Sequence, residues 1–192
     1  MNRGNFFTVP FRRKREGRTY YKKRLKILGS DKCRFVVRRS LRNIQVSLVK
    51  FDVKGDKVLL TVNSRALDKL GWKGDNGNVP SAYLTGMLAA KKAKEKGIKD
   101  AILDIGFSNS TKGNRIYAAL AGAKAGGLEI PCDKEVLPNE DRFTGAHISK
   151  YAESLKSKKD EYQKQFSSYL KKGLNPEDLT KHFNEIKGKI HG

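Results

Sequence analysis

Positive charge is concentrated at the start of this sequence. Ten of its thirteen arginines lie within residues 1–42, which also hold five lysines and only two acidic residues, Glu16 and Asp31. This segment therefore carries +13 of the net charge of +21. A segment whose charges repel one another so strongly does not readily become part of a hydrophobic core. We therefore expect residues 1–32 to form a basic extension, with the folded core beginning at about residue 33.

The kind of basic residue in this segment is informative. Arginine presents a planar fork of donors that fits two phosphate oxygens at once, and it stays charged. A surface that needs charge alone can use lysine, as the rest of the chain does. Aromatic rings, which stack on unpaired bases, are interleaved with the arginines at Phe6, Phe7, Phe11, Tyr20 and Tyr21. The combination favours RNA as the partner.

Two other interpretations of the extension are weaker. A solvated, self-repelling tail is the first, but the sign and composition of the segment agree with an isoelectric point of about 10.0 for the whole chain, as in nucleic-acid-binding proteins. A membrane-surface segment is the second. The basic run over residues 12–18 has no apolar face to bury in lipid.

Composition limits the remaining possibilities. A chain of 192 residues with 38% hydrophobic residues suits one domain of ordinary size plus extensions. No apolar run approaches the roughly 18 residues of a spanning helix, and the first residues lack the apolar stretch of a secretory signal. Cys33 and Cys132 are isolated, so they predict neither a zinc site nor a disulfide framework. We expect a reduced, cytoplasmic protein with no membrane contact.

Three segments after the extension have the pattern of β-strands. Residues 33–40 are rich in β-formers, and residues 43–51 alternate apolar and polar side chains. A turn is expected at 52–56, and residues 57–62 supply a third strand. Strands with such short connections predict an antiparallel meander.

The first of these strands should have one basic face. Arg34 and Arg38 are four positions apart and share a side, whereas Phe35 and Val37 point the other way. We expect Phe35 and Val37 to face the core beneath helices. Arg34 and Arg38 would then lie with the extension on an open, RNA-facing side, with Arg39 near the strand end.

The following region alternates helix and strand. A glycine-rich loop at 71–77 precedes a helix at about 80–96, and the short apolar run 101–106 suits a buried, central strand. After a loop at 107–113, a second helix carries apolar residues at helical spacing. Together with the meander, this order predicts an α/β fold, a mixed sheet with packed helices.

The last part of the sequence is expected to be helical. Residues 175–178 have a cap, a proline and two acids, which is typical of a helix start. Leu179, Phe183, Ile186 and Ile190 then form one stripe, which more often covers a core than binds a ligand. The chain thus divides into a basic RNA-binding extension (1–32), an α/β core domain (33–143) and a helical C-terminal region (144–192).

Asp104 is the candidate for catalysis. Metal-dependent nucleases use aspartates at strand ends, but they need further carboxylates that converge on the ion. Asp52 and Asp100 could lie near it, although their spacing does not require this. A strand-end aspartate that accepts hydrogen bonds from loop amides is commoner. We therefore expect no catalytic residue, no bound metal and no cofactor, with a metal-dependent nucleic-acid enzyme as the alternative.

The loop Lys112-Gly113-Asn114-Arg115 opens the second helix. Free amides, the helix dipole and two cations would make a phosphate site there. A plain helix cap with exposed charges explains the same residues equally well.

Several strings in the sequence resemble one family. They are VPFRRKREGRTYYKKR at 9–24, GWKG at 71–74, PSAYLTGMLAAKKAKEKG at 80–97, ILDIG at 102–106, and EVLP, DR and GAHI between 135 and 148. In this order they resemble the archaeal and eukaryotic branch of the ribosomal protein family that binds 5S rRNA, universal large-subunit protein eighteen. The resemblance covers about residues 8–155, and the length of the chain favours the archaeal form.

This resemblance implies a fold of the ribonuclease H-like translational-component type, used without nuclease chemistry. It implies a ribosome-bound protein of the central protuberance, with 5S rRNA as main ligand. It also implies contacts with large-subunit rRNA and with neighbouring ribosomal proteins, including the other 5S rRNA-binding protein. Family members also have a Lys-Gly-x-Arg loop after Asp-Ile-Gly. For residues 112–115, the resemblance therefore favours a phosphate site over a plain helix cap.

The residues that we expect to contact RNA come from the extension, the first strand and its turn, and the motifs of the resemblance. They are Arg3, Phe11, Arg12, Arg13, Lys14, Arg15, Arg18, Tyr20, Tyr21, Lys22, Lys23, Arg24, Arg34, Arg38, Arg39, Arg42, Trp72, Lys73, Lys112 and Arg115.

Overall fold

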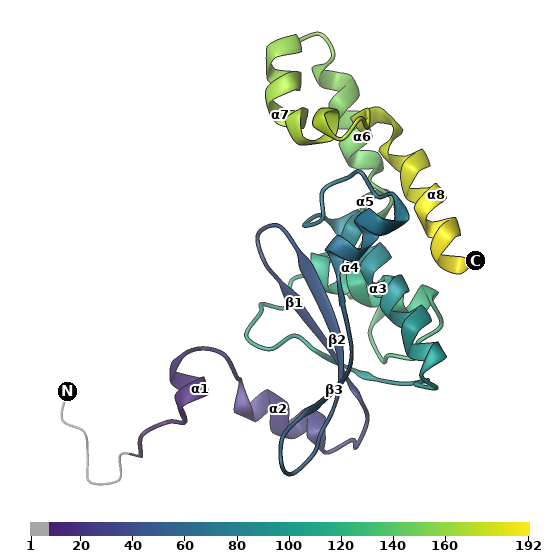
Figure 1. Cartoon of the computed structure of the whole chain (residues 1–192). Helices are drawn as coiled ribbons and strands as arrows, with labels where there is room; N and C mark the ends of the chain where they lie inside the picture. Colours follow the sequence, from purple (N-terminus) through teal and green to yellow (C-terminus); the bar gives the residue numbers. More distant parts are fainter. Residues whose placement is uncertain (1–7) are drawn as a thin grey trace, which may run out of the picture.

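The computed structural model describes residues 8–192, which form a mixed α/β fold around a four-stranded sheet (Figure 1). Arg3 lies outside the described residues. The α-helices are α1 (Arg12–Arg15), α2 (Tyr21–Leu28), α3 (Val79–Glu95), α4 (Arg115–Ala125), α5 (Glu140–Phe143), α6 (Ala146–Leu155), α7 (Lys159–Lys171) and α8 (Leu179–His191). The strands are β1 (Arg34–Arg39), β2 (Ile44–Lys50), β3 (Lys57–Asn63) and β4 (Ile102–Asp104), and short 3₁₀ turns are η1 (Ser64–Leu70), η2 (Lys134–Val136) and η3 (Pro176–Asp178).

The predicted meander is confirmed. The strand order is β3-β2-β1-β4, with β1, β2 and β3 antiparallel and β4 parallel to β1. In the register, Val37 faces Val46 and Val46 faces Val62, so one face of the sheet is apolar along its width. The mixed sheet with packed helices agrees with the predicted fold class, and the ribonuclease H-like assignment stays a prediction.

The position of β4 differs from the prediction of a central strand. Within the described part of the chain, β4 pairs with β1 alone and lies at the edge of the sheet. Its apolar character has another cause: Ala101 is fully buried, and Ile27 of α2 shares a pocket with Leu103 and Ile105. A helix of the extension, rather than a second strand, therefore covers this edge.

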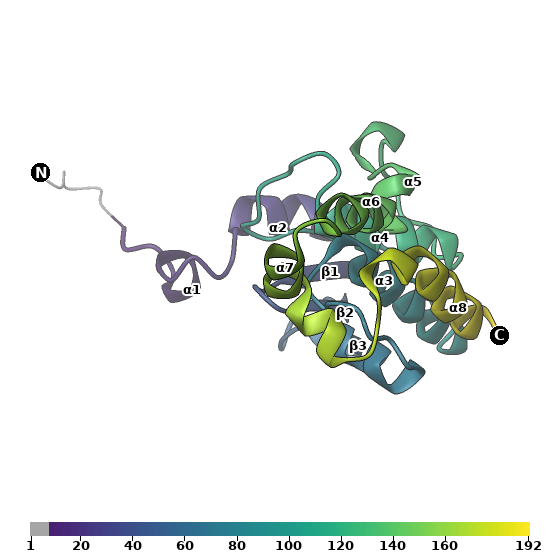
Figure 2. The ribbon, with the colours of Figure 1, turned by 90° about the horizontal axis from the view of Figure 1, so that it is seen from above.

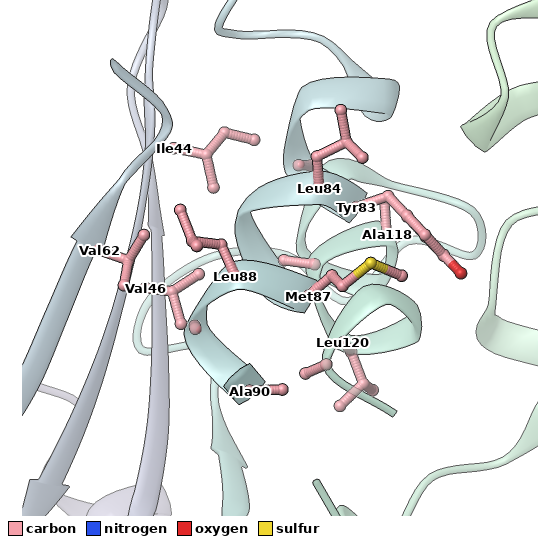
Figure 3. Packing of buried hydrophobic residues seen from close by; sticks show 14 of the residues in the cluster. Ile44, Val46, Val62, Tyr83, Leu84, Met87, Leu88, Ala90, Ala118 and Leu120 are labelled. Atoms are coloured by element: carbon pink, nitrogen blue, oxygen red, sulfur yellow. The ribbon is translucent and has the colours of Figure 1, made fainter. Parts of the chain in front are cut away.

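Helix α3 occupies the centre of the core. Figure 3 shows Leu88 directed from α3 toward Val46 and Val62 of the sheet, while Leu120 comes from α4 on the far side of α3. All four side chains are at most 9% exposed. The predicted helix at 80–96 thus packs against β2, β3 and α4, and α4 itself contacts β1.

Helices α3 and α4 approach each other through glycine. A Cβ atom on Gly86 would lie 1.9 Å from the carbonyl oxygen of Ala119, and one on Gly122 would lie 1.9 Å from that of Tyr83. No side chain fits at such distances, so the two glycines set the spacing of the helix pair.

The last helix returns to the core. The predicted stripe of Leu179, Phe183, Ile186 and Ile190 is almost fully buried. The ring centroid of Phe183 lies 5.6 Å from that of Tyr83 on α3. The predicted helix start is present as η3, which leads directly into α8.

Helices α6 and α7 have a small cluster of their own. It is built from Ala152, Leu155 and Phe166, and Figure 1 shows both helices at the end of the molecule opposite α2. Across residues 8–192, every helix is too short or too polar to cross a membrane.

Candidate nucleic-acid interface

The two faces of β1 carry different chemistry, as predicted. Phe35 and Val37 are fully buried in the core beneath the helices. Arg34 and Arg38 point to the opposite face, and Arg39 is exposed at the end of the strand. The predicted orientation of all five side chains is therefore confirmed.

Residues 19–24 of the basic extension lie against this second face. Thr19, Tyr20 and Arg24 share a pocket of about 270 Å³ with Val36 of β1 and Val58 of β3. Figures 1 and 2 show α2 beside one end of the sheet. The face that we expected to be open is therefore partly covered by the protein's own N-terminal segment.

Three arginines and two aspartates join the extension to the sheet. Arg24 of α2 donates to Asp56 at 2.9 Å, and Arg34 bridges Asp56 (2.5 Å) and Asp104 (3.2 Å). Arg38 lies 3.3 Å from the other carboxylate oxygen of Asp104 and donates to its backbone carbonyl at 2.9 Å. We call these five residues the arginine–aspartate network. Positive and negative groups alternate along it, so each carboxylate lies between two guanidinium groups.

The network overturns one expectation. Arg34 is only 5% exposed, and its two terminal nitrogens are bound to carboxylates. A phosphate group could not reach it without displacing Asp56 or Asp104. The expectation that Arg34 lies open to RNA is therefore wrong. Arg34 instead links Asp104 of β4 to Asp56, the residue that Arg24 of the extension contacts.

Asp104 has the structural environment expected of it. Its Oδ1 atom accepts a hydrogen bond from the amide of Gly106 at 2.8 Å, in addition to its two arginine contacts. Asp100 pairs with Lys32, and Asp52 pairs with Lys57. Across the described residues, no three metal-ligating side chains gather at one point.

A groove next to the network, which shares Arg38 with it, is lined by five arginines. It has a volume of about 740 Å³ and contains no acidic side chain. Its basic residues come from the extension, β1 and the start of α4. We call this the arginine groove, and its lining residues are Arg13, Gly17, Arg18, Arg38, Arg39, Ser40, Leu41, Ile105, Phe107, Ser108 and Arg115.

Besides Arg38, three of these arginines are held by protein contacts of part of the guanidinium group. Nε of Arg13 donates to the hydroxyl of Thr19 at 2.9 Å, and Nε of Arg18 lies 3.0 Å from Glu16. Nη1 of Arg115 donates to two backbone carbonyls, at 2.6 and 3.2 Å. Each keeps other N–H groups free of these contacts, so the groove presents oriented donors.

The loop at 112–115 is a helix cap. The Asn114 side chain accepts hydrogen bonds from the amides of Ile116 and Tyr117, so these amides are not free to bind phosphate. Lys112 pairs with Glu135 at 2.9 Å, whereas Arg115 lines the arginine groove. The two cations therefore do not converge on one point, so the observed cap does not favour the phosphate interpretation of the loop, which stays a prediction.

Trp72 and Lys73 lie outside the groove. Trp72 is 2% exposed, stacks on His182 with ring centroids 5.2 Å apart, and donates to the carbonyl of Asp75 at 3.3 Å. Its ring is therefore not available to a base. Lys73 is exposed, but it does not line the groove.

The other expected residues divide by exposure. Tyr21, Arg24 and Arg115 are half-buried. The exposed residues are Phe11, Arg12, Arg13, Lys14, Arg15, Arg18, Tyr20, Lys22, Lys23, Arg38, Arg39, Arg42 and Lys112.

Sequence reasoning missed two residues of this region. Asp56 lies in a turn and links Arg24 to Arg34, and no sequence pattern marks it. Phe107 lines the groove, and the sequence shows it as one apolar residue in a polar loop. An exposed aromatic side chain in such a loop was the available signal.

The fold and this site define a class, a basic α/β protein whose arginine-lined surface suits a phosphate polymer. Comparison with known proteins gives the family. Residues 5–100 and 93–133 match the family described as ribosomal large subunit proteins 60S L5 and 50S L18. The sequence is also 50% identical, over 184 residues, to the large ribosomal subunit protein uL18 of Methanococcus maripaludis, covering 96% of this chain and 95% of that protein.

This chain belongs to the family of ribosomal large subunit proteins 60S L5 and 50S L18. The relative is archaeal, which agrees with the archaeal form favoured from the sequence.

Proposed function

We propose that this protein binds 5S rRNA and helps to anchor it in the central protuberance of the large ribosomal subunit. In this proposal it also contacts large-subunit rRNA and neighbouring ribosomal proteins, including the other 5S rRNA-binding protein. It acts as a structural component without catalytic activity or cofactor, bound to ribosomes in the cytoplasm. Family membership supports the ribosomal part of the proposal, and the resemblance noted in the sequence supports the choice of 5S rRNA.

The arginine groove is the observation that carries the RNA-binding role. Five arginines line one surface, and the lining contains no acidic residue. Two of them also pair with carboxylates outside the lining, Arg18 with Glu16 and Arg38 with Asp104. Arginine binds phosphate oxygens through charge-assisted, often bidentate hydrogen bonds. Four of the five are already oriented by protein contacts, so less side-chain freedom is lost when RNA binds.

The environment of Asp104 weighs against a metal-dependent enzyme. Both of its carboxylate oxygens face arginine, and two-metal chemistry needs several carboxylates around the ions. The neighbouring carboxylate Asp56 is bound to Arg24 and Arg34 in the same way. Two guanidinium groups at each carboxylate repel a divalent cation electrostatically.

The test is the salt dependence of binding to a 5S rRNA transcript. If the protein neutralises roughly six to ten phosphates, log K should fall with log salt at a slope of about −4 to −9. Deletion of residues 1–24 should flatten this slope and weaken binding, because it removes Arg13 and Arg18 from the groove. A truncated protein with the slope of the parent would refute the assignment.

A series of substitutions distinguishes the contribution of the groove arginines to RNA binding from that of positive charge elsewhere on the protein. Arg13→Ala, Arg18→Ala and Arg39→Ala remove three groove cations, and Lys164→Ala, Lys171→Ala and Lys172→Ala remove three cations near α7. The first triple variant should bind 5S rRNA more weakly, and its plot of log K against log salt should be less steep. The second should keep most of the affinity and of the steepness. Incubation of the parent with RNA and Mg²⁺ should leave the RNA intact.

A further inference from the structure

Phe107 lies in the arginine groove with 45% of its surface exposed. It follows Gly106, whose φ of +59° is the left-handed conformation that glycine adopts most readily. Its ring centroid lies 5.5 Å from that of Tyr20, with an angle of 84° between the planes. The extension therefore fixes the position of an exposed aromatic ring.

The geometry of this pair leaves Phe107 with a free face. In an edge-to-face pair, the ring that offers its edge keeps both faces, and the ring that offers its face keeps one. Whichever way the pair is arranged, Tyr20 covers at most one face of Phe107. Tyr20 is less available, because the ammonium group of Lys23 lies 5.1 Å from its ring centre.

The surroundings of Phe107 supply the other half of a nucleotide site. Its groove contains five arginines, and Ser108 lies on the same lining. The volume of about 740 Å³ falls in the range of roughly 300–1,000 Å³ for pockets that hold small ligands. Guanidinium groups that can bind phosphate and an aromatic ring thus occur together in one recess.

We propose that the arginine groove receives an unpaired nucleotide of the RNA, with its phosphates on the arginines and its base stacked on Phe107. The inference rests on the proposed function and specifies which form of RNA enters the groove. In an A-form duplex the bases are stacked on one another, so no base face is offered to a side chain. A loop or bulge nucleotide offers its base face and its phosphate together.

The experiment uses the full chain with Phe107→Leu and Phe107→Trp. Affinities are measured for a 5S rRNA transcript, a single-stranded oligoadenylate and an RNA duplex of equal length. Phe107→Leu should bind the transcript and the oligoadenylate at least about fivefold more weakly, because base stacking is lost. Phe107→Trp should bind both at least as well as the parent, and the duplex should bind all three proteins equally.

Two further readouts distinguish stacking from a displaced extension. Phe107→Leu removes no charge, so the salt slope should stay that of the parent, whereas displacement of Arg13 and Arg18 would flatten it. The indole introduced by Phe107→Trp should be quenched when oligoadenylate binds, while the parent, whose Trp72 is buried, should show little quenching.

The inference is overturned if Phe107→Leu binds the transcript and the oligoadenylate as tightly as the parent, or if its weaker binding comes with a flattened slope. Either result would leave the proposed function standing if the parent binds 5S rRNA. A different result would overturn the proposed function and uphold the stacking site. In that result the parent shows no preference for 5S rRNA, yet it binds oligoadenylate more tightly than Phe107→Leu does.

Discussion

Arg34 and Asp104 form a buried ion pair of 3.2 Å between the neighbouring strands β1 and β4. Each is at most 7% exposed, and each has a second partner, Asp56 for Arg34 and Arg38 for Asp104. A buried charge that loses its partner destabilises a protein far more than an exposed one does. The pair therefore ties the stability of the sheet to the position of the basic extension.

Neutralising Asp104 should reduce stability without affecting any catalysis. Asp104→Asn leaves Arg34 and Arg38 short of a negative partner, and we expect a loss of about 3 kcal/mol in the free energy of unfolding. Chemical denaturation measures this. Asp52→Asn is the control, because its pair with Lys57 is on the surface, and it should change little. Mg²⁺-dependent RNA cleavage that disappears in Asp104→Asn would instead restore the enzyme interpretation.

Replacing arginine by lysine should have opposite consequences at two positions of β1. Arg39→Lys keeps the charge in the arginine groove but loses the bidentate fork, so 5S rRNA binding should weaken by about 1 kcal/mol or more with little change in stability. Arg34→Lys cannot bridge Asp56 and Asp104 in the same way, so it should lower stability. Equal binding by Arg39→Lys and the parent at several salt concentrations would show that charge alone matters there.

The glycine contacts between α3 and α4 predict a large packing effect. Gly86→Ala places a methyl group where the carbonyl of Ala119 lies, and we expect destabilisation of about 3 kcal/mol. Gly188→Ala is a matched control, because it lies in α8 with open space around its Cβ position. It should stabilise the protein by roughly 0.5–1 kcal/mol through helix propensity. Similar melting temperatures for the two variants would contradict this account of the helix spacing.

Stability should fall in mild acid because of His182. Burial lowers the pKa of its imidazole below the ordinary value of 6.5, opposed by Glu185 and supported by the positive charges of Lys73 and Lys189. The Nε2 atom accepts a hydrogen bond from the amide of Lys73 at 3.1 Å, which a protonated ring cannot do.

The direction in which stability changes with pH follows from proton binding. Below pH 6.5 the unfolded chain takes up a proton at this histidine while the folded chain does not, so the stability present above that pH is lost as the pH falls toward the lowered value. Unfolding free energies from about pH 8 to about pH 5 should decline more steeply in the parent than in His182→Gln. His191→Gln, at the exposed end of α8, should decline like the parent.

The sequence by itself determined the main strands and helices, their order and the side of β1 that enters the core. Alternation placed Phe35 and Val37 inward and Arg34 outward, and helical spacing placed Leu179 and Phe183 in the core. These patterns are local, because each depends on the repeat of a single helix or strand. The concentration of arginine in the extension was equally plain, because composition needs no coordinates.

Tertiary structure alone decided which charges are free. Arg34 and Arg39 are alike in sequence, yet Asp56 and Asp104 neutralise Arg34, while Arg39 lies open in the arginine groove. The ring of Trp72 is unavailable to RNA because it stacks on His182, which lies more than a hundred residues further along the chain. Ion pairing and burial depend on groups brought together by the fold, and their energies change steeply with distance and exposure to water. For that reason a basic segment could be assigned from sequence, whereas the residues that remain available within it required the structure.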